Sequence, residues 1–282
     1  MVEEQAAYLR LIALENLDGV PSDQSVAVLV LNRPKAANAF SGELIVMITA
    51  LLGQVARDPH IRALILQGEG KHFSAGADLH WMQEAARLDY AGNLHEAEKL
   101  THMFEALAGL KIPTISLVKG AAFGGAVGLI AACDYAFAWE GARFCLSETK
   151  IGLLPAVILP YLARKIPAGP LHRQILTARI LSAAEAQQFG LIQGVHAPDV
   201  MEQSVREELN ALLGASPEAQ ASYKKLHREL ALSHWQQSPS TAVAIAETRA
   251  STMGQAGLAA FFQKQAPAWT LRLPLASPIC LP

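Results

Sequence analysis

A glycine turn and one isolated acid are the residues of this sequence whose types and spacing indicate catalysis. Residues 124–126 (Gly-Gly-Ala) lie between the β-rich run Thr114–Val118 and the apolar run Val127–Cys133. A strand followed by a glycine turn and a helix leaves free backbone N–H groups at the start of the helix, where negative charge is stabilised. Glu148 follows, and Glu140 is the only other acid between residues 135 and 160. A backbone anion site with one carboxylate nearby predicts enolate chemistry.

A second segment, His72–Leu79 (HFSAGADL), is crowded with small residues. Its Ala-Gly-Ala centre is compatible with a tight turn before a helix capped by Asp78. The lack of bulky side chains also lets a ligand approach the backbone, so that the N–H of Ala77 points at an acceptor oxygen of that ligand. The residues alone leave both interpretations open.

Four motifs, in this order and spacing, resemble those of the enoyl-CoA hydratase/isomerase (crotonase) superfamily. They are Leu31–Phe40 (LNRPKAANAF), His72–Leu79, Gly120–Leu129 (GAAFGGAVGL) and Phe144–Ala156 (FCLSETKIGLLPA). The resemblance implies an α/β fold, a crotonase-like spiral of ββα units with a C-terminal helical oligomerisation region. It is less specific for the reaction, because one fold hosts many functions.

The resemblance also implies the roles of individual residues. Ala77 and Gly125 would supply the two N–H groups of an oxyanion hole, and Glu148 would exchange a proton with the acyl group. Burial between apolar segments should raise the pKa of Glu148 toward the range useful for proton transfer. Coenzyme A enters as part of the substrate, with no separate cofactor and no metal expected. Its predicted contacts, besides Ala77 and Gly125, are Lys35, Ala36, Ala75, Asp78, Leu79 and, reaching a neighbouring subunit's coenzyme A, Phe261 and Lys264.

Gly128 departs from the pattern of crotonase-type hydratases, which carry a water-activating glutamate at this position. With that acid missing, Glu148 would take a proton from water and deliver one to the α-carbon. Alternatively, a second carboxylate on the substrate would help to hold the water in the space that the missing acid leaves. Residues Pro155–Pro160 bring large apolar groups that should reshape the acyl pocket.

Gly128 and the segments SETKIGLLPAVI and AGADLHWMQ most resemble bacterial hydratases of branched glutaconyl-CoA thioesters. Their substrates are 3-methylglutaconyl-CoA in leucine breakdown and isohexenylglutaconyl-CoA in acyclic terpene breakdown. An enoyl-CoA isomerase is the main alternative, because moving a double bond needs one base, and a non-catalytic acyl-CoA binder is a third. By charge alone, Lys150, Arg164 and Lys165 are candidates to bind a distal carboxylate.

Apolar periodicity and turn residues predict the elements that position these motifs. A hairpin-like pair of strands is expected at Tyr8–Leu14 and Ser25–Leu31, and two further strands are expected at Ala63–Gln67 and Thr114–Val118. The chain should return to a strand from Gly190. Helices are expected at Ser41–Arg57 with Ser41 as N-cap, over most of His80–Gly109, and within Leu171–Gln188, where Ser182 and Glu185 form a capping box. By resemblance, Trp81 and Met82 would cover the acyl pocket.

From Asp199 onward the sequence patterns are helical, and we expect a helical appendage that packs on a neighbouring subunit. Residues 1–198 should form the spiral core with the active site, and residues 199–282 a helical trimerisation region with an irregular tail from Thr270. A hydrophobic content of 51% and the resemblance favour a homotrimer or a dimer of trimers. The predicted helices are Val200–Leu213, Glu218–His234, Ser240–Thr252 and Ala256–Gln265.

Charge and cysteine usage narrow the class of protein. A net charge of -2, from 23 basic and 25 acidic residues, lacks the excess of positive charge that is typical of nucleic-acid-binding proteins. Cys133, Cys145 and Cys280 lack metal-ligand spacing, which favours buried thiols in a reducing compartment. The start of the chain lacks the basic residues of a targeting peptide, and no apolar run reaches the length of about 18 residues that indicates a membrane span. The prediction is a cytoplasmic protein without a membrane partner.

Overall fold

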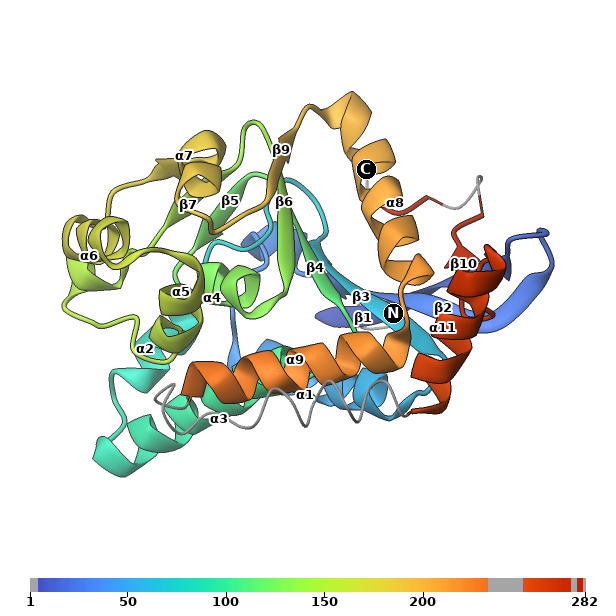
Figure 1. Cartoon of the computed structure of the whole chain (residues 1–282). Coiled ribbons are helices and arrows are strands. Elements are labelled where there is room, and N and C mark those ends of the chain that lie inside the picture. The colour runs from blue at the N-terminus through green and yellow to red at the C-terminus, as the bar shows by residue number, and fades with distance from the viewer. Residues whose placement is uncertain (1–4, 233–250, 275–277, 281–282) are drawn as a thin grey trace.

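The structure is a computed structural model that describes residues 5–232, 251–274 and 278–280. Figure 1 shows a twisted sheet through the middle of the molecule, a smaller sheet beside it and helices around both. Within the described ranges, no helix is long and apolar enough to cross a membrane. Most of the helix predicted at Ser240–Thr252 lies outside these ranges.

The central sheet has seven strands in the order β10-β1-β2-β3-β4-β6-β9. β1 and β2 form the predicted antiparallel hairpin, and from β2 to β9 each neighbouring pair runs parallel. The strands predicted from sequence around residues 8–31, 63–67 and 114–118 are confirmed. The bounds are β1 Ala7–Asn16, β2 Pro21–Leu31, β3 Ile61–Gly68, β4 Thr114–Val118, β6 Tyr135–Trp139, β9 Gly194–His196 and β10 Leu271–Arg272.

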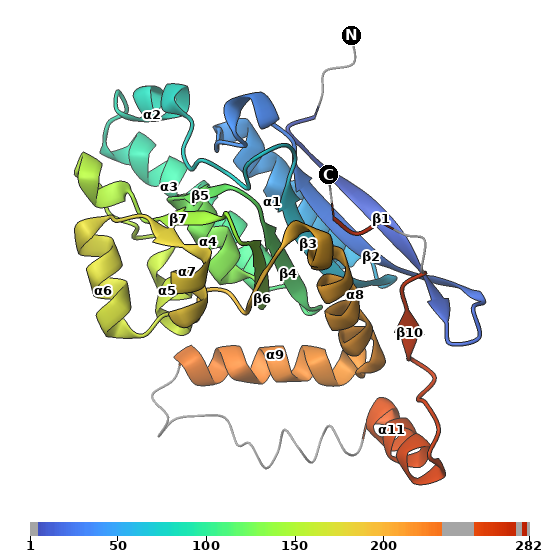
Figure 2. The same ribbon diagram turned by 90° about the horizontal axis from the view of Figure 1, so that it is seen from above.

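Both faces of this sheet are covered, which explains the unbroken apolar run at the end of β2. Val26, Val28 and Val30 pack in a cluster with α8 (Pro198–Gly214) on one face. The alternating residues 27, 29 and 31 pack on the other face in a cluster that includes residues of α1 (Gly42–Arg57), α3 (Tyr90–Ala108) and α4 (Gly125–Ala132). Figure 2 shows α8 on one side of the sheet, with α1 and α3 on the other. A strand buried on both faces requires apolar residues at consecutive positions.

A smaller sheet carries the glycine turn, and this corrects one prediction. Its strands, in the order β5-β7-β8, are β5 Ala121–Phe123, β7 Arg143–Cys145 and β8 Leu181–Ser182. The strand that leads into the turn is β5, not the Thr114–Val118 run. Strands of two or three residues are too short to show an alternating pattern, so the sequence did not reveal them.

The predicted helices that lie within the described residues are confirmed in type, but one of them is divided in two. The His80–Gly109 region forms α2 (Leu79–Ala85) and α3 (Tyr90–Ala108), each with its own aspartate cap. The helix predicted from Ser182 is confirmed as α7 (Ala183–Gln188), which the predicted capping box opens, and α6 (Ala168–Thr177) precedes it. The remaining N-terminal helices are α1 (Gly42–Arg57), capped by the Ser41 hydroxyl, α4 (Gly125–Ala132) and α5 (Leu159–Lys165).

The C-terminal region is helical but returns to the sheet. α9 (Pro217–Leu232) and α11 (Thr252–Gln263) follow α8. β10 then pairs with β1, so the prediction that strands end at Asp199 and that the tail is irregular from Thr270 is wrong at this point. The strand predicted from Gly190 begins later, at Gly194. The division of the chain at residue 198 stays a prediction.

Candidate active site

Ala77 lies between β3 and α2, and hydrogen bonds to Phe40 fix the direction of its amide. The Phe40 N–H donates to the Gly76 carbonyl (2.7 Å), and the Asp78 N–H donates to the Phe40 carbonyl (2.9 Å). In a trans peptide the C=O and N–H point in opposite directions, so the Ala77 N–H points away from Phe40. Ala77 is exposed, and its N–H donates no hydrogen bond to the described residues. It is available to an external acceptor.

Gly125 is the first residue of α4, and its N–H points out of the helix. The carbonyl of Gly124 accepts a hydrogen bond from the Val127 N–H (2.9 Å), so the N–H of the same peptide unit points beyond the N-terminus. The Gly124 N–H donates to the Cys145 carbonyl (2.8 Å), and its φ of 53° is in the region that favours glycine. Among hydrogen bonds of the described chain, none comes from the Gly125 N–H.

The two turns are in direct contact. An isolated parallel bridge joins Ser74 to Ala122. A Cβ on Gly76 would lie 2.9 Å from the Phe123 carbonyl oxygen and 3.8 Å from the Gly124 nitrogen. A side chain at position 76 would therefore push the turns apart. The structure thus brings together the segments of Ala77 and Gly125, the two predicted donors.

Glu148 opens a short 3-10 helix, η2 (Glu148–Ile151), and its carboxylate faces the glycine turn. A Cβ on Gly124 would lie 3.2 Å from Glu148 Oε1 and 3.7 Å from its Cδ. Glu148 Oε2 is buried without a hydrogen-bond partner among the described residues. Desolvation raises the pKa of Glu148, as predicted, while a hydrogen bond to its own backbone opposes the rise. A proton-accepting group therefore lies beside the residue that precedes Gly125.

No space exists where the first acid of hydratases would begin. A Cβ on Gly128 would lie 2.2 Å from Ile158 Cγ2, 2.8 Å from Ile158 Cβ and 3.0 Å from Phe104 Cε1. Ile158 and Phe104 are both buried. Apolar side chains therefore fill the position where a side chain at residue 128 would begin. The expectation that a second substrate carboxylate helps to hold the water stays a prediction.

Most of the residues predicted to contact coenzyme A lie in two joined segments. The Ala75 N–H donates to the Ala37 carbonyl (2.9 Å) and ties the segments together. Leu79 is 77% exposed. The first segment contributes Lys35 and Ala36, within the 3-10 turn η1 (Pro34–Ala36), and the second contributes Ala75, Asp78 and Leu79, on either side of the Ala77 amide.

Asn38 holds the first segment in place, a role that the sequence did not reveal. It is fully buried and has a φ of 54°. Its Oδ1 accepts from the Arg33 N–H (2.8 Å), and its Nδ2 donates to the carbonyls of Glu69 (2.9 Å) and His72 (2.8 Å). Asparagine tolerates the left-handed conformation, so its place at the end of a Pro-Lys-Ala-Ala turn was an available signal.

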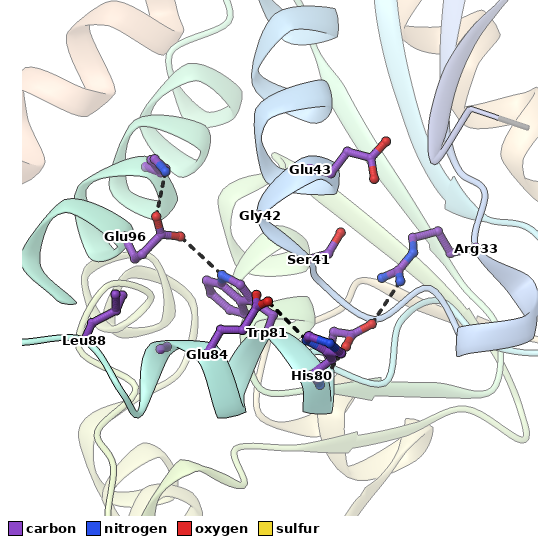
Figure 3. A pocket seen from close by; sticks show the side chains of 12 residues that line it. Arg33, Ser41, Gly42, Glu43, His80, Trp81, Glu84, Leu88 and Glu96 are labelled. Carbon is purple, nitrogen blue, oxygen red and sulfur yellow. Dashed lines mark hydrogen bonds and ion pairs between the residues drawn. The ribbon is translucent and has the colours of Figure 1, made fainter. Parts of the chain in front are cut away.

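A cavity of about 610 Å³ opens beside Asp78 (Figure 3). Trp81, predicted to cover the acyl pocket, lines it and donates its indole N–H to Glu96 (3.2 Å). The two cationic side chains are already paired, Arg33 with Asp78 (2.9 Å) and Lys99 with Glu96 (2.6 Å). Carboxylates are in excess, so the cavity does not favour another anion. With His80, its ionisable side chains are Arg33, Lys99, Glu43, Asp78, Glu84 and Glu96.

Phe261 and Lys264 do not join the other predicted residues within one chain. Phe261 lies in α11 and Lys264 directly follows that helix. In both Figures 1 and 2, α11 lies beside β10, away from α2 and α4. Their contact with the coenzyme A of a neighbouring subunit stays a prediction.

Two of the candidates for a distal carboxylate lie at the wrong end of α4. Lys165 donates to the carbonyls of Ile130 (3.4 Å) and Asp134 (3.3 Å), at the last turn of the helix. Arg164 lines a second cavity at this same end. An eight-residue helix is about 12 Å long, whereas the two carboxyl carbons of a glutaconyl chain are only four bonds apart. Lys150, within η2, is the remaining candidate.

Similarity to known proteins now identifies the fold and then the family. A solved enoyl-CoA hydratase from Shewanella pealeana matches with a TM-score of 0.84 and 38% identity, over 94% of this chain and 97% of that one. AtuE from Pseudomonas aeruginosa matches with a TM-score of 0.82 and 31% identity, over 92% and 99%. The fold is therefore the α/β crotonase type, as predicted.

The sequence pattern of the enoyl-CoA hydratase/isomerase family matches residues 22–272. A protein named as a probable enoyl-CoA hydratase, EchA8 of Mycobacterium tuberculosis, is 32% identical over 263 residues, which is 90% of this chain and 97% of the relative. The chain belongs to the enoyl-CoA hydratase/isomerase family.

Proposed function

We propose that this protein adds water across the α,β-double bond of an enoyl-CoA thioester. The observation that supports this function is the Glu148 carboxylate against Gly124, next to two backbone N–H groups without partners in the described chain. The thioester oxygen accepts from the N–H groups of Ala77 and Gly125. These donors stabilise the enolate that forms when water attacks the β-carbon, and one such donor typically contributes about 3 kcal/mol.

Glu148 carries both proton transfers. Its carboxylate takes a proton from water as the oxygen bonds to the β-carbon, and the resulting carboxylic acid then gives a proton to the α-carbon on the same face. The carboxylate is regenerated and no other acid is consumed. A raised pKa suits this double role, because it makes the carboxylate a better base near neutral pH.

For the acyl group we propose a branched glutaconyl-CoA, either 3-methylglutaconyl-CoA or isohexenylglutaconyl-CoA. The motifs around Gly128 support this substrate, and the loss of one glutamate removes like-charge repulsion with a second carboxylate. Lys150 is the proposed counter-charge. The proposal includes a cytoplasmic homotrimer or dimer of trimers, in which Phe261 and Lys264 reach a neighbour's coenzyme A.

An enoyl-CoA isomerase is the second candidate, favoured by the single acid. Moving a double bond needs the same oxyanion stabilisation and one carboxylate that carries a proton between two carbons. The apolar filling beside Gly128 leaves no second protein acid at that position, which is consistent with either reaction.

The test is to incubate the purified protein with 3-methylglutaconyl-CoA, isohexenylglutaconyl-CoA, crotonyl-CoA and a 3-enoyl-CoA, and to follow product mass and double-bond position. A gain of one water on a glutaconyl thioester, with crotonyl-CoA poor, supports the proposal. Double-bond migration without a change in mass would identify an isomerase. Glu148→Gln should abolish turnover, while Glu140→Gln, a change in the other acid of the same stretch, should not.

A matched pair of variants tests the distal carboxylate. Lys150→Met should lower kcat/KM for the glutaconyl thioester more than for crotonyl-CoA. Arg164→Met, which removes a cation at the far end of α4, should change kcat/KM for neither thioester. Equal effects of the two variants would rule out Lys150 as the counter-charge.

A further inference from the structure

Phe40 contacts both halves of the candidate oxyanion hole. Its backbone forms the isolated parallel bridge with Ala77, through hydrogen bonds with the Gly76 carbonyl and the Asp78 N–H. Its ring lies against the other half, because a Cβ on Gly125 would lie 2.8 Å from Phe40 Cε2 and 3.2 Å from Cδ2. The side chain is 2% exposed, so its position is fixed by the core.

From these contacts we propose that Phe40 is a positioning residue that sets the direction and separation of the two N–H donors, an inference that rests on the proposed function. The backbone of Phe40 orients one amide, and its ring limits how closely the Gly125 end of α4 approaches. The two donors come from separate loops, and a single residue that touches both supplies a common reference. Phe40 itself does not contact the substrate.

The elements around Phe40 hold it rigidly. The Arg33 guanidinium donates to the Ala39 carbonyl on one side (2.5 Å), and the Ser41 hydroxyl caps α1 on the other. The ring also packs in the cluster that includes residues of α1 and α4. A change in the ring should therefore alter Gly125 more than the chain around position 40.

The test uses Phe40→Leu, with Phe137→Leu as the control. Phe137 is also a buried phenylalanine but lies in the hydrophobic cluster on the opposite face of the sheet. The readouts are kcat, KM and the infrared C=O stretch of bound butyryl-CoA labelled with ¹³C at the thioester carbonyl. Butyryl-CoA has no double bond to hydrate, so the stretch reports hydrogen bonding to the oxygen without turnover.

Phe40→Leu should lower kcat by about 10- to 100-fold, since a misplacement of about 1 Å can cost about 100-fold, with KM changed far less. The C=O frequency, lowered in the wild-type complex, should move back toward that of the free thioester. Phe137→Leu should leave the frequency at the wild-type value. Phe40→Met better preserves the side-chain volume, so its kcat and C=O frequency should lie between those of the wild type and Phe40→Leu. It replaces Phe40→Leu in the test if that variant does not fold.

The outcomes separate the inference from the function on which it rests. If the C=O frequency of butyryl-CoA did not shift on binding to the wild-type protein, the oxyanion hole and hence the proposed function would be contradicted. A normal wild-type shift that Phe40→Leu leaves intact, or that Phe137→Leu reduces equally, would overturn the positioning role of Phe40 alone.

Discussion

Gly128 provides a direct test of the packing that replaces the missing acid. In Gly128→Ala, the new Cβ would lie 2.2 Å from Ile158 Cγ2 and 2.8 Å from Ile158 Cβ, whereas carbon atoms normally pack at about 3.5–4.0 Å. The Cβ of Ile158 is tied to its backbone, so a rotamer change cannot remove both contacts. Overpacking of this kind costs about 1–3 kcal/mol, and the contacts here favour the upper end.

Alanine is the better helix former, which offsets part of this cost. The difference between glycine and alanine within a helix is about 1 kcal/mol, so the net loss for Gly128→Ala should be about 2 kcal/mol. For a protein of this size, that corresponds to a fall in Tm of about 3–4 °C. The matched control is Gly169→Ala in α6, where nothing lies within 4 Å of the new Cβ, and this variant should be as stable as the wild type or more so.

Urea unfolding of the single and double variants measures the coupling between positions 128 and 158. Ile158→Ala removes the 2.2 Å contact, so the double variant should lose less stability than the sum of the single losses, by about 1 kcal/mol or more. Additive losses, or a Gly128→Ala protein as stable as Gly169→Ala, would refute the conclusion that Ile158 excludes a side chain at position 128.

Two further predictions concern a titrating group and a buried amide. Glu148 has a raised pKa in the folded state, so between its unfolded and folded pKa values the folded state binds more protons and stability falls as pH rises. Glu148→Gln should therefore be more stable than wild type at neutral pH. Thermal unfolding should show that this difference vanishes below about pH 4, where the carboxyl group is protonated in both states. Asn38→Ala removes three buried hydrogen bonds and places alanine at a positive φ; urea unfolding should show a loss of about 3 kcal/mol or more, and KM for the CoA thioester should rise.

The sequence predicted long elements and local caps well, because those signals are contained within a few turns of chain. The period of α1, its Ser41 cap and the capping box that opens α7 are all local patterns that the structure confirms. Short strands were missed, including β5, β7 and β10, which have two or three residues, and β6, which has five. Such strands are defined by their partners in the sheet, and those partners lie far away in the sequence.

The candidate site shows the same limit. Motif spacing pointed to Ala77, Gly125 and Glu148, and the structure brings their segments together. The sequence could not show what lies beside position 128, where the glutamate is absent, because a glycine is compatible with an open space or with a close neighbour. Only the fold shows that Ile158, from the start of α5, fills this position. The same contact ties α5 to α4, whose first N–H is one of the two candidate donors. Restoring the acid by Gly128→Glu alone should therefore disturb α4 before it adds a second base.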